Sequence, residues 1–126
     1  MNYFILELND EVYKLRLTSA DCIEIEKSKN TKMLDYIRDY SHTTIATLLR
    51  YLCKSDRPNF SMNNACELMD KLIDNGYTLE RILYDVIYEA LVVSGFLTKA
   101  ELEEVKNTSA KALEKNKEKI QEALQN

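Results

Sequence analysis

The stretch from residue 79 to 94 is the most apolar part of the chain and restricts what the rest can fold into. Its apolar residues recur at helical spacing in one stripe, which Tyr84, Tyr88 and Val92 extend sideways. The stripe comprises Leu79, Ile82, Leu83, Val86, Ile87, Ala90 and Leu91. An apolar arc this wide predicts a helix that lies at the centre of a core or meets two interfaces.

Helix-breaking residues are rare and indicate where the other helices end. The 126 residues include two glycines and a single proline. Pro58 disfavours helix at the residue before it, so residues 55–60 are predicted to form a loop. Gly76 and Gly95 suit the left-handed conformation that closes helices. The pattern predicts about five helices, near residues 18–29, 32–40, 44–54, 61–75 and 79–94.

The first four of these helices have recognisable inward faces, and the first and third have recognisable caps. Thr18 with Asp21 has capping-box spacing, and Ser41 or Thr43 can cap the third helix. Helical spacing assigns to the core Ala20, Cys22, Ile23, Met33, Leu34, Ile37, Ile45, Leu48, Leu49, Leu52, Ala65, Leu68, Met69, Leu72 and Ile73.

The N-terminal segment has the pattern of a β-hairpin. Residues 2–8 and 11–17 are predicted to be strands around Asn9-Asp10, which suit a two-residue loop. If residue 8 pairs with residue 11, one face is apolar, with Phe4, Leu6, Tyr13 and Leu15. The other face is mixed, with Tyr3, Ile5, Glu7, Val12, Lys14 and Arg16. Two strands alone are marginal, so the hairpin must pack on helices or extend a partner's sheet.

The last part of the chain differs in kind. Thr98 and Glu101 form a second capping box, which opens a helix predicted to run to about residue 124. Its apolar residues are sparse among many Lys and Glu: Leu102, Val105, Ala112, Leu113, Ile120 and Leu124. We therefore predict an α+β, mainly α protein: a compact hairpin-plus-helices core over residues 1–97 and an extended charged helix over 98–126.

Composition excludes several classes of protein. A net charge of -4 argues against a coat for DNA or RNA, because such binding relies on Lys and Arg. No stretch is apolar enough to span a bilayer, and the start lacks the features of a signal peptide. We expect a cytoplasmic protein that binds neither nucleic acid nor membrane.

The sequence offers little for catalysis. Cys22, Cys53 and Cys66 form no C-x-x-C pair, and we interpret all three as buried reduced thiols. A nucleophile would need the single histidine, His42, as its base. Two glycines cannot supply a Gly-rich phosphate loop. We expect no enzyme and no cofactor.

One arrangement resembles a metal site. Asp35, Asp39 and His42 would share one helix face if a helix ran through Ser41. Ser41, however, is typical of a cap that ends this continuity. We therefore expect exposed acids and no bound metal.

Eight tyrosines without any tryptophan allow two interpretations. Tyr77, Tyr84 and Tyr88 lie along one line and could stack on bases. Few basic residues accompany them, Arg81 being the main one. A protein interface or the rim of the core is therefore the preferred interpretation.

Two segments carry a resemblance to a known family. YKLRLTSADCIEIEKSKNTKMLDYI, residues 13–37, resembles the opening of tail assembly chaperones of long-tailed bacteriophages (siphoviruses) or their prophages. YDVIYEALVVSGFL, residues 84–97, is similar to the late core helix of that family. With the spacing between them, the likeness covers residues 11–97. The family often has Gly-Lys-Asn-Pro where this chain has residues 28–31, SKNT.

The resemblance implies a non-enzymatic chaperone in the cytoplasm of the bacterial host, absent from the mature virion. Such proteins bind and solubilise the tape measure protein. A longer form made by ribosomal frameshifting helps bring tail tube subunits to it. This chain would be the short form, and several copies of it would assemble along one client.

Seven residues are candidates for partner binding, because a helical client calls for apolar surface rather than catalytic groups. They are Tyr77, Tyr84, Tyr88, Leu102, Val105, Leu113 and Ile120. Two alternatives remain open: a structural head-tail or tail component, and a small helical regulatory protein that binds host factors or nucleic acid.

Overall fold

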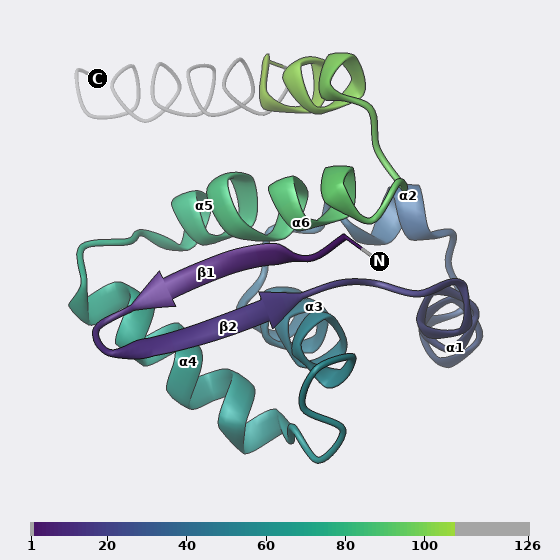
Figure 1. Cartoon of the computed structure of the whole chain (residues 1–126). Coiled ribbons are helices and arrows are strands. Elements are labelled where there is room, and N and C mark those ends of the chain that lie inside the picture. The colour runs from purple at the N-terminus through teal and green to yellow at the C-terminus, as the bar shows by residue number, and fades with distance from the viewer. Residues whose placement is uncertain (1, 108–126) are drawn as a thin grey trace, which may run out of the picture.

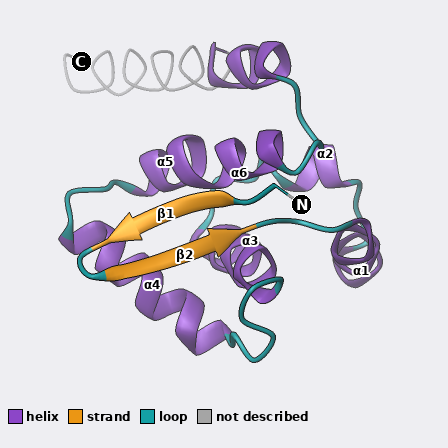
Figure 2. Ribbon diagram, in the orientation of Figure 1, coloured by secondary structure: helices purple, strands orange, loops and turns teal. Residues whose placement is uncertain are grey.

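The computed structural model describes residues 2–107 and has a mainly helical α+β fold (Figure 2). A hairpin of β1 (Phe4–Leu8) and β2 (Glu11–Leu15) is followed by helices (Figure 1). These are α1 (Ser19–Lys29), α2 (Met33–Tyr36), α3 (His42–Lys54), α4 (Met62–Asp74), α5 (Leu79–Arg81), the π-helix η1 (Ile82–Ile87) and α6 (Tyr88–Val93). A further helical stretch covers 99–107. The remainder of the predicted charged C-terminal helix lies outside the described residues.

The predicted hairpin register is confirmed. Leu6 pairs with Tyr13 and Phe4 with Leu15, so the two strands present one apolar face to the helices. Leu6, Tyr13 and Leu15 are each less than 5% exposed. Asn9 takes a positive φ of 56° in the turn, a conformation that asparagine tolerates better than most residues.

Side-chain caps fix where the helices begin. Thr18 and Asp21 form the predicted capping box, and Ser41 accepts a hydrogen bond from the amide of Thr44. The amide of Glu101 donates to Thr98 Oγ1, at 3.1 Å, in the box that opens the last helical stretch. These bonds satisfy amides that have no partner within the helix, so each helix starts at a defined residue.

The apolar stretch predicted as one helix is α5, η1 and α6 in succession. Ile82, Val86, Ile87 and Leu91 are each at most 1% exposed, which confirms its central position. The π-helical part was not predicted, because the spacing of the apolar residues does not distinguish it from an α-helix. Gly95, with φ of 89°, closes α6 as expected.

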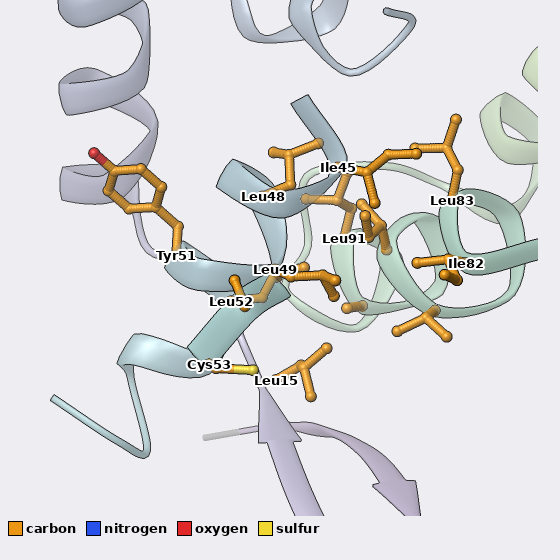
Figure 3. Packing of buried hydrophobic residues seen from close by; sticks show 14 of the residues in the cluster. Leu15, Ile45, Leu48, Leu49, Tyr51, Leu52, Cys53, Ile82, Leu83 and Leu91 are labelled. Carbon is orange, nitrogen blue, oxygen red and sulfur yellow. The ribbon is translucent and has the colours of Figure 1, made fainter. Parts of the chain in front are cut away.

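One core joins the hairpin to the helices. In Figure 3, Leu49 of α3 extends towards the segment that carries Ile82 and Leu91, and the sulfur of Cys53 of α3 points towards Leu15 of β2; all five side chains are buried. The amide of Arg16 donates to the carbonyl of Leu52, at 3.0 Å, and ties the end of β2 to α3. The hairpin is therefore packed on helices, and this packing supplies the stability that an isolated two-stranded sheet lacks.

Four residues predicted to be in the core are exposed instead: Ala20, Ile23, Leu34 and Ile73. Ile23 lies two residues, or about 200° of helical rotation, from each of the inward positions of α1, Asp21 and Ile25, so it is on the opposite side of that helix. Ile73 follows the inward Leu72 of α4 by about 100°. The predicted helix at 32–40 is wrong in length: α2 has four residues, so helical periodicity does not carry Leu34 inward.

Cys66 is likewise exposed rather than buried. It follows Ala65, whose side chain is on the inward face of α4. Cys53 is buried as predicted, and Cys22 is half-buried. In the part of the chain that the structure describes, no helix is long and apolar enough to cross a membrane.

Candidate partner-binding groove

An apolar groove opens where α1, α2 and the end of α6 meet. It encloses about 190 Å³. Apart from Glu101, the residues around it are apolar or carry sulfur: Leu17, Cys22, Met33, Leu34, Ile37, Leu91, Phe96 and Leu97. We refer to this feature as the groove. No catalytic arrangement is needed for its chemistry, which is the removal of apolar surface from water.

The groove has a buried floor and an exposed rim. Leu17 and Leu91 are each 1% exposed, and Ile37 is 3% exposed. At the rim, Leu34 is 52% exposed and Phe96 is 38% exposed. Large apolar side chains held open to water beside a dry floor gain most when a partner covers them.

Hydrogen bonds fix the walls. The amide of Leu17 donates to Ser94 Oγ at 3.0 Å, and that hydroxyl donates to the carbonyl of Ala90 at 2.7 Å. The amide of Met33 donates to a carboxylate oxygen of Glu26 at 3.1 Å, which ties α2 to α1. The groove is therefore preformed, because its three walls are joined by bonds that no partner has to supply.

The exposed position of Phe96 follows from the way α6 ends. The amide of Phe96 donates to the carbonyl of Leu91 at 2.9 Å, and that of Gly95 to the carbonyl of Val92 at 3.0 Å. This pair of bonds with a left-handed glycine is a Schellman motif. It directs the chain back over the helix end and places Phe96 at the rim rather than in the core.

The thiol in the groove is not a nucleophile at neutral pH. Burial raises the pKa of Cys22 to about 11, and the negative charges of Asp21 and Glu26 add to the shift. Burial likewise raises the pKa of Cys53 to about 12. Both groups remain thiols at pH 7, so they act as apolar packing groups.

Two of the predicted contact residues lie in the core, which corrects their assignment to a surface. Tyr88 is 1% exposed, and its hydroxyl donates to the carbonyl of Ile37 in a buried hydrogen bond. Burial raises the pKa of its phenol. Leu102 is 3% exposed. Residue spacing placed Tyr88 on the tyrosine line and Leu102 on the sparse stripe of the last helix, but it does not reveal which side of each helix faces the core.

The other predicted residues divide into two groups. Tyr77, Tyr84 and Val105 are half-buried and pack against the core with part of each side chain open to a partner. Leu113 and Ile120 lie outside the described residues. The predictions for these five positions remain predictions.

The structure places a further tyrosine, Tyr40, close to Tyr84, one of the tyrosines that residue spacing grouped along one line. Tyr40 is 49% exposed. Burial of part of the ring, followed by the charge of Glu80 on α5, raises the pKa of Tyr40, and Tyr84 adds to the shift. A residue from the α2–α3 connection therefore lies near α5 and η1. Only the tertiary fold brings these segments together, so residue spacing gives no signal for it.

The main basic residue near these tyrosines is already engaged. The guanidinium of Arg81 lies 4.8 Å from the ring centroid of Tyr77. Its Nε lies 3.2 Å from a carboxylate oxygen of Asp85. A phosphate would have to displace these contacts, which weakens the base-stacking interpretation.

The residues of the metal-like arrangement do not share a helix. Asp35 is in α2, His42 opens α3, and Asp39 lies between them. Asp39 accepts a hydrogen bond from Thr44 Oγ1 at 2.8 Å, so its carboxylate supports the start of α3. Among residues 2–107, no group of three or more His, Cys, Asp and Glu side chains is placed to hold a metal ion.

A larger cavity, of about 420 Å³, lies between the hairpin turn and α4. Two of its charged side chains contact each other: Lys71 Nζ lies 3.4 Å from a carboxylate oxygen of Glu11, which also accepts a hydrogen bond from the hydroxyl of Tyr13. Arg57 lies 4.3 Å from the ring centroid of Tyr13 and donates to the carbonyl of Val12 at 3.1 Å. We refer to this feature as the polar cavity.

Comparison with protein-family models, with curated proteins and with solved structures found no match to this chain.

Proposed function

We propose that this protein is a non-enzymatic tail assembly chaperone that binds and solubilises the tape measure protein. The observation that carries the proposal is the groove, with Leu34 and Phe96 exposed over an apolar floor. The resemblance of residues 11–97 to tail assembly chaperones supplies the class of client. Both point to a protein that works by covering apolar surface.

A tape measure protein is a long helical polymer with apolar seams, and the groove suits one of its amphipathic helices. In this mode, apolar side chains of the client enter between Leu34 and Phe96 while the polar face of its helix stays in water. Burial of one large apolar side chain stabilises the complex by about 1.5–3 kcal/mol. A single groove therefore binds weakly, and several copies along one client are needed for effective shielding.

Glu101 gives the groove a preference for the client's charge. Among the described residues that line the groove, Glu101 is the only one with a charged side chain. Its Oε1 accepts a hydrogen bond from the amide of Thr98 at 3.1 Å, which holds the carboxylate at the rim. A client helix with Lys or Arg beside its apolar residues gains an added attraction there.

Recruitment of tail tube subunits belongs to the longer form of such chaperones. The present chain would act on the tape measure protein, and a frameshifted product would connect this complex to the tube. A slippery heptanucleotide in the codons for the Lys-rich end, followed by an overlapping reading frame, would support this division of roles.

Coexpression with the neighbouring tape measure gene tests the proposal. We expect the chaperone to raise the soluble fraction of the tape measure protein and to copurify with it. A tape measure protein that remains insoluble and does not copurify would contradict the proposal. Mass spectrometry of purified particles distinguishes the chaperone from a structural tail component, because a tail component would be present in stoichiometric amount in the mature virion.

A further inference from the structure

The outer face of the hairpin carries two exposed apolar side chains that do not line the groove. Ile5 is 48% exposed and Val12 is 49% exposed. Ile5 is on β1 and pairs with Lys14 of β2, and Val12 is on β2 and pairs with Glu7 of β1. Figure 1 shows no described helix over this face of β1 and β2. The four side chains form a rectangle, here called the outer quartet.

Charge and apolar character are arranged diagonally in the outer quartet. Ile5 and Val12 lie on one diagonal, and Glu7 and Lys14 lie on the other. Neither Glu7 nor Lys14 makes an ion pair with another residue in the part of the chain that the structure describes. Both charges are therefore available to a partner.

We infer that the outer quartet pairs with the outer quartet of a second copy, about a twofold axis along the Ile5–Val12 diagonal. Such an axis places Ile5 on Ile5 and Val12 on Val12 of the other copy. It also brings Glu7 of each copy next to Lys14 of the other. The same patch then serves both subunits, as a twofold interface requires.

Other twofold axes in this face give poorer matches. An axis along the strands sets Ile5 against Lys14, and an axis across the strands sets Ile5 against Glu7. An axis along the charged diagonal sets each charge against its own kind. Apolar contact and opposite charges coincide only for the axis that we infer, so charge complementarity selects the occupant and the geometry together.

The inferred axis also defines how the two hairpins cross. With strands about 4.8 Å apart and a rise of about 3.4 Å per residue, the diagonal lies about 35° from the strand direction. The hairpins therefore cross at about 70°, within the range between aligned and orthogonal packing of sheets. The contact is much smaller than the roughly 800 Å² per partner of a standard interface, so we expect weak, reversible dimers.

Sedimentation equilibrium of the full chain from micromolar to millimolar concentration measures the association. We expect a monomer–dimer equilibrium whose association constant falls about tenfold or more in Glu7→Lys and in Lys14→Glu, because each places like charges together. The double variant Glu7→Lys/Lys14→Glu should restore most of the association. Glu103→Lys and Lys27→Glu make the same changes of charge at exposed positions elsewhere and should leave it unchanged.

Cysteine cross-linking tests the axis itself, in a Cys66→Ser background that removes the exposed native thiol. We expect Ile5→Cys and Val12→Cys to form disulfide-linked dimers on oxidation, since each meets its own counterpart. Lys14→Cys should not, because it meets residue 7. Circular dichroism confirms that each variant is folded.

Several outcomes would overturn the inference. A chain that stays monomeric to millimolar concentration has no such interface. Association that the charge reversals leave unchanged, or cross-linking of Lys14→Cys as ready as that of Ile5→Cys, places the interface elsewhere. Loss of tape measure binding in the quartet variants, without self-association of the parent chain, would assign the face to the client.

Discussion

The groove and the polar cavity differ in whether their side chains already have partners within the protein. The polar cavity is the larger, but its Glu11, Tyr13, Arg57 and Lys71 already contact one another. The groove is smaller, yet apolar side chains at its rim remain in water. Free energy is gained on binding when exposed apolar area is covered, whereas satisfied polar groups must first be separated. The unsatisfied region, and not the larger one, is therefore the better candidate for partner binding.

The largest effect should come from the groove floor. Leu91→Ala removes a side chain that is 1% exposed and leaves a cavity in the core. We expect a loss of about 2–5 kcal/mol in the free energy of unfolding, measured by urea denaturation. Leu34→Ala, at the rim, is the matched control and should change stability by less than about 0.5 kcal/mol. Equal losses would show that floor and rim are not distinct.

The rim should determine client binding without affecting the fold. Leu34→Glu and Phe96→Glu each place a charge where the client's apolar residues would lie. We expect each to weaken binding to the tape measure protein about tenfold or more, measured by titration calorimetry or copurification. Ile73→Glu is the control, since Ile73 is 45% exposed on α4. If Ile73→Glu weakens binding as much, general surface hydrophobicity rather than the groove is responsible.

The wall of the groove tests how far its shape is preformed. Ser94→Ala removes the hydroxyl that accepts from the amide of Leu17 and donates to the carbonyl of Ala90. We expect stability to fall by about 1 kcal/mol and client affinity to fall with it, because Leu17 loses its tether. Ser28→Ala, at an exposed position in α1, should change neither. Unchanged client affinity in Ser94→Ala would mean that the partner shapes the groove on binding.

The local elements of the fold could be predicted from the sequence, whereas the groove could not. The hairpin register, the α3 stripe and the Gly95 helix end were predictable, because alternation, helical spacing and left-handed glycine act locally. The groove was not predictable. Helical spacing assigned Leu34 to the core, and it assigned Phe96 to neither the core nor the surface. Their exposure depends on the shortness of α2 and on the chain reversal after Gly95, which only the packed structure reveals.

The assignment of Tyr88 failed for a related reason. Its neighbours on the helix made it part of a tyrosine line, but its hydroxyl finds a buried acceptor, the carbonyl of Ile37. A phenol can enter a core when such an acceptor is present, and the acceptor comes from a segment 51 residues away in sequence. Single-sequence patterns do not contain that pairing.

The smallest effects should come from the polar cavity, and they concern pH rather than client binding. The hydrogen bond from the hydroxyl of Tyr13, followed by the contact with Lys71, lowers the pKa of Glu11 below its ordinary value of 4.5. A lowered pKa in the folded state adds stability above the unfolded value, and this stability is lost as the pH falls through the folded value. Tyr13→Phe and Lys71→Met should therefore each raise the pKa of Glu11, as measured by NMR titration of the carboxyl carbon. Neither variant should alter client affinity at pH 7. Loss of client binding in Lys71→Met, at the level of the rim variants, would move the functional site from the groove to the polar cavity.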